Sequence, residues 1–128
     1  MNRRTLIAAA SLLAFAPLAQ AQAAEAEFTK KAFEAAQKDG KRILVDVWAV
    51  WCPTCKAQQP ILKSQLNAPE NKDVVFLRVN FDTQLDVLKA FGVQQQSTLI
   101  MFKGAKEVAR TVGDTTPDGI AKLVGASA

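Results

Sequence analysis

The chain of 128 residues carries 16 basic and 12 acidic side chains, two cysteines and no histidine. Without histidine, Ser-His and Cys-His catalysis and most zinc or haem sites are excluded. The small net charge and the lack of a basic run argue against binding to nucleic acid.

The first 21 residues have the layout of an export signal. A basic start at residues 1–4 precedes an apolar run over residues 6–18 and the small-residue pattern Ala19-Gln20-Ala21, which is typical of a cleavage site. The apolar run is too short to cross a hydrocarbon core of ~30 Å as a helix. We therefore expect cleavage after Ala21, a periplasmic or otherwise exported location, and no stable membrane insertion after cleavage. An uncleaved anchor or a buried N-terminal helix is the alternative.

The remaining residues, 22–128, are enough for one small domain. Residues 25–27 are expected to be a mobile start, and helical spacing predicts a helix from Phe28 to a stop at Gly40. Residues 43–49 are mostly β-branched and aromatic without polar alternation, which predicts a central strand covered on both faces. A helix follows from Pro53 to about Leu66, with Pro60 expected to kink it.

The second half of the chain continues the alternation. Residues 74–79 predict a buried strand, and residues 85–91 a short amphipathic helix closed by Gly92. Residues 98–102 and 107–112 predict an antiparallel hairpin, and Thr116-Pro117-Asp118 has the composition of a helix start. The order predicts an α/β domain with a central mixed β-sheet flanked by helices on both faces.

Cys52 and Cys55 lie only three residues apart. A bridge between them would close too short a loop to stabilise the fold, so the spacing points to chemistry. Cys52 falls between a strand and a helix that Pro53 opens, where free N–H groups and the helix dipole stabilise a thiolate and lower a cysteine pKa. We expect Cys52 to be the exposed attacking thiol and Cys55 to be the resolving thiol that breaks a mixed disulfide.

Two other interpretations of the cysteine pair stay open. The pair could be inert, or two thiols at this spacing could hold a soft cation such as Cu(I) in a binding or metal-delivery module. Zinc is disfavoured because a closed site needs four ligands and the chain offers two thiols and no histidine. The leading interpretation needs no metal and no cofactor other than a redox-active Cys52–Cys55 disulfide.

Asp46 lies inside the predicted central strand, where an unpaired buried carboxylate is costly or takes up a proton. One interpretation is a buried carboxyl group of raised pKa that accepts the proton of Cys55, directly or through water. The other is a side chain that reaches solvent at the sheet edge.

Three segments together resemble thioredoxin: Asp46-Val47-Trp48-Ala49, Trp51-Cys52-Pro53-Thr54-Cys55-Lys56, and Pro60. The similarity continues through residues 78–82, 91–93 and 98–99 and the region of Gly113. It implies the thioredoxin fold, an activity as protein-disulfide oxidoreductase, and clients that are proteins with disulfides. It also implies that Trp48 and Trp51 pack near the site. The residues expected to contact substrate are Trp51, Pro53, Gln96, Ser97 and Thr98.

Two departures from the family pattern affect the expected chemistry. Ser97 stands where thioredoxins have a cis-proline, so either the Gln96–Ser97 bond is trans and the loop changes, or the loop is strained. We expect looser shielding of the thiols, an altered grip on extended peptides and easier metal access, unless Ser97 is a harmless substitution. The dipeptide Pro53-Thr54 adds no positive charge, which favours reduction or isomerisation over oxidation. By family analogy, an exported reductant implies a membrane-spanning thiol electron donor.

Overall fold

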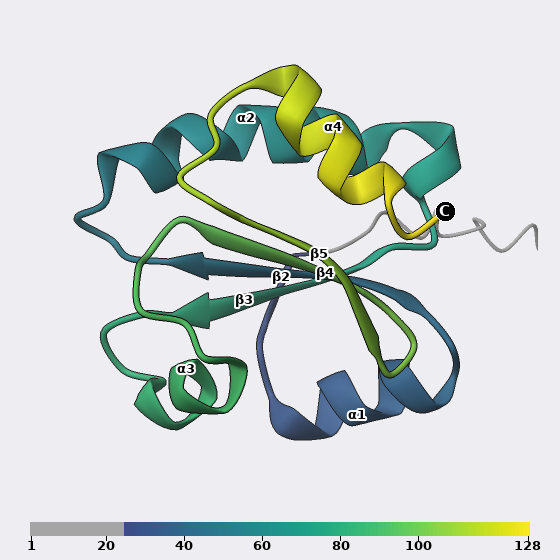
Figure 1. The fold of residues 1–128 in the computed structure, drawn as a ribbon, viewed down its shortest axis with the longest axis horizontal. Helices are drawn as coiled ribbons and strands as arrows, with labels where there is room; N and C mark the ends of the chain where they lie inside the picture. Colours follow the sequence, from purple (N-terminus) through teal and green to yellow (C-terminus); the bar gives the residue numbers. More distant parts are fainter. Residues whose placement is uncertain (1–24) are drawn as a thin grey trace, which may run out of the picture.

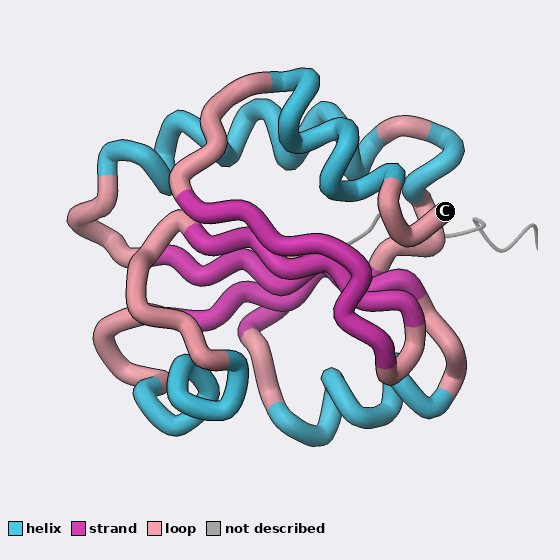
Figure 2. The backbone as a smooth tube through the Cα atoms, in the orientation of Figure 1, coloured by secondary structure: helices cyan, strands magenta, loops and turns pink. Residues whose placement is uncertain are grey.

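The computed structural model describes residues 25–128, so the export signal expected over residues 1–21 lies outside the described residues. Within these residues, one five-stranded sheet has the order β1-β3-β2-β4-β5 (Figure 1, Figure 2). Its strands are β1 (Ala26–Glu27), β2 (Arg42–Trp48), β3 (Val75–Asn80), β4 (Thr98–Lys103) and β5 (Lys106–Val112). The pairs β1–β3 and β3–β2 are parallel, whereas β2–β4 and β4–β5 are antiparallel. The sheet is therefore mixed, as predicted.

Helices cover both faces of the sheet. They are α1 (Lys30–Lys38), α2 (Pro53–Asn67), the 3-10 turn η1 (Pro69–Asn71), α3 (Leu85–Phe91) and α4 (Pro117–Gly125). Figure 1 places α2 and α4 on one face and α1 and α3 on the other. The hydroxyls of Thr29 and Thr116 accept backbone hydrogen bonds at the starts of α1 and α4, and α2 continues through Pro60.

The central strand β2 alternates between two hydrophobic cores. Ile43, Val45 and Val47 pack on the side of α1 and α3, whereas Leu44 packs on the side of α2 and α4. All four side chains are fully buried. The continuous apolar run thus reflects a strand covered on both faces, and the strand ends directly before the cysteine pair.

The expectation of a mobile start at residues 25–27 was wrong, because Ala26 and Glu27 form β1 against Leu77 and Arg78 of β3. A two-residue strand carries no periodicity of its own, and its pairing depends on an edge of β3 that lies far along the chain. Among residues 25–128, no helix combines the length and apolarity needed to span a bilayer.

Candidate active site

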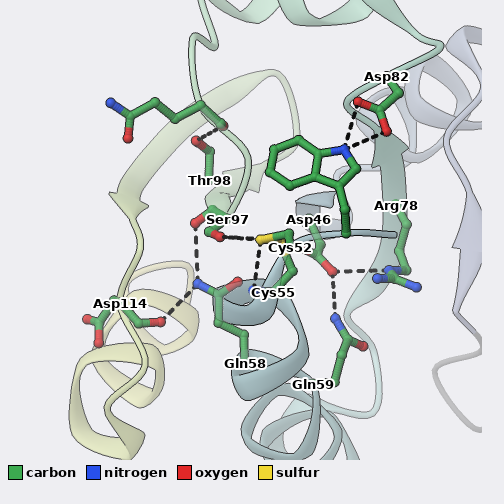
Figure 3. Close-up of a disulfide and its surroundings, with 12 residues drawn as sticks. Asp46, Cys52, Cys55, Gln58, Gln59, Arg78, Asp82, Ser97, Thr98 and Asp114 are labelled. Atoms are coloured by element: carbon green, nitrogen blue, oxygen red, sulfur yellow. Dashed lines mark hydrogen bonds and ion pairs between the residues drawn. A yellow bond between two sulfur atoms is a disulfide. The ribbon is translucent and has the colours of Figure 1, made fainter. Parts of the chain in front are cut away.

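The cysteine pair lies where β2 gives way to α2. Cys52 is the N-cap of α2 in extended conformation and Pro53 opens the helix, as predicted. The Cys55 N–H donates to Cys52 Sγ at 3.1 Å. The two cysteines form a disulfide with their Cα atoms 5.3 Å apart (Figure 3). The fold therefore brings the two predicted thiols into bonding contact at a helix N-terminus.

The expected exposure of Cys52 was wrong. Cys52 is 0% exposed and Cys55 only 2%. The pair packs with Ala49 and the partly buried Trp48 and Phe81. Because the sulfur of Cys52 is covered in this oxidised state, an attacking sulfur can reach it only if the surrounding loops move.

The loop facing the disulfide explains part of this cover. None of residues 25–128 follows a cis peptide bond, so the Gln96–Ser97 bond is trans. Ser97 has φ +66°, in the left-handed region that a serine rarely adopts. Its hydroxyl oxygen lies 3.1 Å from Cys52 Sγ and 3.2 Å from Cys55 Sγ (Figure 3). The expectation of looser shielding was therefore wrong, because Ser97 turns its side chain onto both sulfurs.

The backbone of Ser97 is held from three sides. Its N–H donates to the Val47 carbonyl at 2.8 Å, and its carbonyl accepts from the Gly113 N–H at 3.0 Å. The same carbonyl accepts from Gln58 Nε2 at 3.2 Å, and this amide also donates to the Asp114 carbonyl at 2.9 Å. The buried Gln58 thus ties α2 to the loops at Ser97 and Asp114.

Sequence reasoning missed Gln58. A signal was present, since Gln58 shares one face of α2 with Cys55 and Leu62 at helical spacing and is a polar side chain on that buried face. A buried amide at such a position needs hydrogen-bond partners from elsewhere in the fold. The sequence gives no means of naming Ser97 and Asp114 as those partners.

Asp46 is fully buried, which rules out the interpretation of a side chain that reaches solvent. Its Oδ2 accepts hydrogen bonds from Gln59 Nε2 and Arg78 Nε, each at 3.1 Å (Figure 3). Its Oδ1 is also buried and has no hydrogen-bond partner among the described residues. Burial raises the pKa of the Asp46 carboxyl above its ordinary value, while Arg78 and Gln59 oppose the rise.

Arg78 connects Asp46 to the edge of the sheet. Its guanidinium carbon Cζ lies 4.3 Å from the centre of the Trp48 ring. Its Nη1 pairs with Glu25 Oε1 at 2.5 Å. A pocket of about 180 Å³ lies against Arg78. Its lining includes Cys55 together with Gln59 and Arg78, the two hydrogen-bond partners of Asp46. The pocket therefore brings Cys55 and the two hydrogen-bond partners of the buried Asp46 carboxyl to one cavity.

The remaining predicted substrate residues differ in accessibility. Trp51 is 53% exposed and its indole N–H donates to the Asp82 carboxylate, and Pro53 is also exposed. Gln96 is half-buried. Thr98 is buried and its hydroxyl donates to the Gln95 carbonyl at 2.7 Å, so it holds the loop. Trp51 and Pro53 are therefore the predicted positions open to a client from solvent.

A mixed sheet with helices on both faces and a Cys-x-x-Cys disulfide at a helix N-terminus defines the thioredoxin-fold class of redox proteins. A family model described as Thioredoxin matches residues 24–126. Thioredoxin from Echinococcus granulosus is 37% identical over 97 residues, which cover 76% of this chain and 88% of the relative. Thioredoxin from Chlamydia muridarum is 39% identical over 82 residues, covering 64% and 78%.

Solved structures agree with the sequence comparisons. Trxlp from Edwardsiella tarda EIB202 superposes with a TM-score of 0.77 at 40% identity, covering 79% of this chain and 98% of that one. The chain belongs to the thioredoxin family. The predicted fold is thereby confirmed, and family membership implies thiol–disulfide oxidoreductase activity.

Proposed function

We propose that this protein exchanges electrons with disulfides of client proteins through Cys52 and Cys55, and that it acts as a reductase rather than an oxidase. The observation that carries the proposal is the Cys52–Cys55 disulfide at the N-terminus of α2. A thiolate at this place accepts the Cys55 N–H and faces the positive end of the helix dipole.

The reaction proceeds in two exchanges. The Cys52 thiolate attacks one client sulfur, so that a bond between Cys52 and the client forms, the client disulfide breaks, and the other client sulfur leaves as a thiolate. Cys55 then loses its proton and attacks Cys52 Sγ, which forms the Cys52–Cys55 bond and releases the second client sulfur. Two electrons pass to the client, whose thiolates take up two protons.

Asp46 is the acceptor for the proton of Cys55. Its Oδ1 is buried and has no hydrogen-bond partner within residues 25–128, while Gln59 and Arg78 contact only Oδ2. Burial raises the pKa of the Asp46 carboxyl and so makes the carboxylate a better base. The proton passes directly or through water in the pocket that Cys55 shares with Gln59 and Arg78.

The surroundings of the sulfurs support the reducing direction. Within residues 25–128, the groups in hydrogen-bond contact with the sulfurs are the Cys55 N–H and the Ser97 hydroxyl, both of them neutral. Neutral donors stabilise a thiolate less than a cationic neighbour does. The reduced form is therefore stabilised moderately, which leaves the dithiol able to give up its electrons.

Clients are proteins because the rim of the disulfide is apolar and exposed. Val50, Trp51 and Val112 are 69%, 53% and 53% exposed. A pocket of about 410 Å³ is lined by Val112, Thr98 and Arg110 and by part of the loop that precedes β4. Exposed apolar side chains around a reactive centre favour contact with a protein surface.

We also propose that the protein works after export, in the periplasm or an equivalent compartment. The basic, apolar and small-residue pattern of residues 1–21 supports this location. A reductant in such a compartment needs electrons from outside it, so its donor would be a membrane-spanning thiol protein. A mass for the exported protein that begins at residue 22 is the expected outcome, and a retained leader would contradict it.

The function is tested with the reduced protein and a disulfide-bonded protein substrate. We expect catalytic formation of client thiols with a matching gain of the Cys52–Cys55 disulfide, measured by thiol alkylation and mass. A Cys52→Ser/Cys55→Ser double variant is the control. Reduced protein that retains stoichiometric Cu(I) against a competing chelator but transfers no electrons would favour the Cu(I) module instead.

A further inference from the structure

The Ser97 hydroxyl must be the hydrogen-bond donor in the oxidised protein. It lies 3.1 Å from Cys52 Sγ and 3.2 Å from Cys55 Sγ. Neither sulfur of a disulfide carries a hydrogen, so only the hydroxyl has one to donate. Because a disulfide sulfur is a weak acceptor, this shared hydrogen bond is weak in the oxidised state.

Reduction changes the acceptor and leaves the donor in place. When the Cys52–Cys55 bond is broken, Cys52 becomes the thiolate, since it also accepts the Cys55 N–H at the start of α2. A hydrogen bond to an anion is roughly twice as strong as one between neutral groups. A donor that touches both sulfurs therefore stabilises the reduced state more than the oxidised state.

The position of the hydroxyl is fixed by the fold. The Ser97 N–H is bonded to Val47, and its carbonyl is bonded to Gly113 and Gln58. These bonds hold the residue at φ +66°, and among residues 25–128 it is the sole non-glycine residue with positive φ. Its side chain is 3% exposed, so water does not compete strongly for the hydroxyl. The loop thus carries a backbone strain that aims one donor at the two reacting sulfurs.

We propose that Ser97 is a catalytic residue of this protein, whose hydroxyl passes from a shared hydrogen bond with the disulfide to a full hydrogen bond with the Cys52 thiolate. The inference deepens the proposed function, on which it rests, by naming a group that tunes both the nucleophile and the redox equilibrium. Stabilising the thiolate makes the dithiol a milder reductant than the same site without the hydroxyl.

The test compares Ser97→Ala with Ser97→Gly. Both variants remove the hydroxyl, but only the glycine variant also relieves the positive φ. We expect each to raise the midpoint of the Cys52 thiolate titration, followed by ultraviolet absorbance, by about one to two pH units. The equilibrium constant for reduction by glutathione should fall about tenfold in both, a potential more negative by about 30 mV.

Ser127→Ala is the matched control. The Ser127 hydroxyl is also fully buried, but it contacts Arg42 and the Val124 carbonyl instead of sulfur. Its loss should lower stability and leave the thiolate titration and the potential unchanged.

Two results would overturn the role of the hydroxyl. One is an unchanged titration midpoint in both folded variants at position 97. The other is a midpoint that moves in Ser97→Ala but returns to the wild-type value in Ser97→Gly, which would assign the effect to the backbone. Failure of the wild type to reduce a protein disulfide would instead defeat the proposed function, since the titration does not need a client.

Discussion

Replacing Asp46 by asparagine removes the proposed proton acceptor of Cys55 while keeping the size of the side chain. The carboxyl group is fully buried, Oδ2 is bonded to Gln59 and Arg78, and Oδ1 has no partner in the described part of the chain. An asparagine retains an oxygen for those two donors but cannot take up a proton. A positioned acid–base group contributes about 10²–10⁴-fold to the step it serves. We expect the second exchange to slow by about 100-fold at neutral pH.

The two exchanges can be measured separately in single turnovers. Quenching with acid and separating species by mass gives the rate at which the mixed disulfide forms and the rate at which it resolves. In Asp46→Asn, formation by Cys52 should be nearly unchanged, and the mixed disulfide should accumulate. The difference in resolution rate between Asp46→Asn and the wild type should shrink as pH approaches ~8.5, the ordinary pKa of a cysteine thiol, because solvent then removes the proton of Cys55.

Asp73→Asn is the control, since the Asp73 carboxylate is exposed and is paired with Arg42 rather than with any group that contacts the sulfurs. It should resolve the mixed disulfide at the wild-type rate. An Asp46→Asn protein that resolves the mixed disulfide as fast as the wild type, or that loses activity only in the first exchange, would refute the role of Asp46.

Three further predictions concern stability and client binding. Because the pKa of Asp46 is raised in the native state, the native carboxyl keeps a proton that the unfolded chain releases above pH 3.8. The contribution of Asp46 to the free energy of unfolding therefore falls as pH rises from that value to the raised pKa. This pH dependence should be absent when the free energy of unfolding of Asp46→Asn is measured by denaturation at the same pH values. Trp51→Phe loses the exposed contact with Asp82; stability should change by less than about 1 kcal/mol, while KM for a protein client rises in steady-state assays. Arg42→Met leaves the buried Ser127 hydroxyl and other acceptors without their donor. The substitution should lower the free energy of unfolding, measured by urea denaturation, by about 3 kcal/mol. The midpoint of the Cys52 thiolate titration should not change.

Local signals were sufficient for most of the fold. The apolar run that became β2 and the Thr116-Pro117 start of α4 are each specified within a few residues, and the structure has both where they were predicted. The placement of Cys52 as N-cap followed from the same kind of signal. The short strand β1 was missed because its pairing with β3 joins residues about fifty positions apart.

Most of the residues that the fold brings to the site could be named from the sequence, but their packing could not. Cys55 and Asp46 were identified from residue type and position, whereas the bond from Gln58 to the Ser97 carbonyl spans 39 residues and has no local pattern. The departure at Ser97 was visible in the sequence, but its effect was predicted with the wrong sign. Loss of proline suggested an opening, and the positive φ of Ser97 instead directs its hydroxyl onto both sulfurs.

The identity of the attacking sulfur is tested most directly by trapping the mixed disulfide. Reduced Cys55→Ser and Cys52→Ser proteins are each mixed with a disulfide-bonded protein substrate, quenched, and analysed by mass without reductant. The account predicts a stable covalent complex with Cys55→Ser, joined through Cys52, and none with Cys52→Ser. Equal amounts of complex from the two variants, or complex from Cys52→Ser alone, would contradict it.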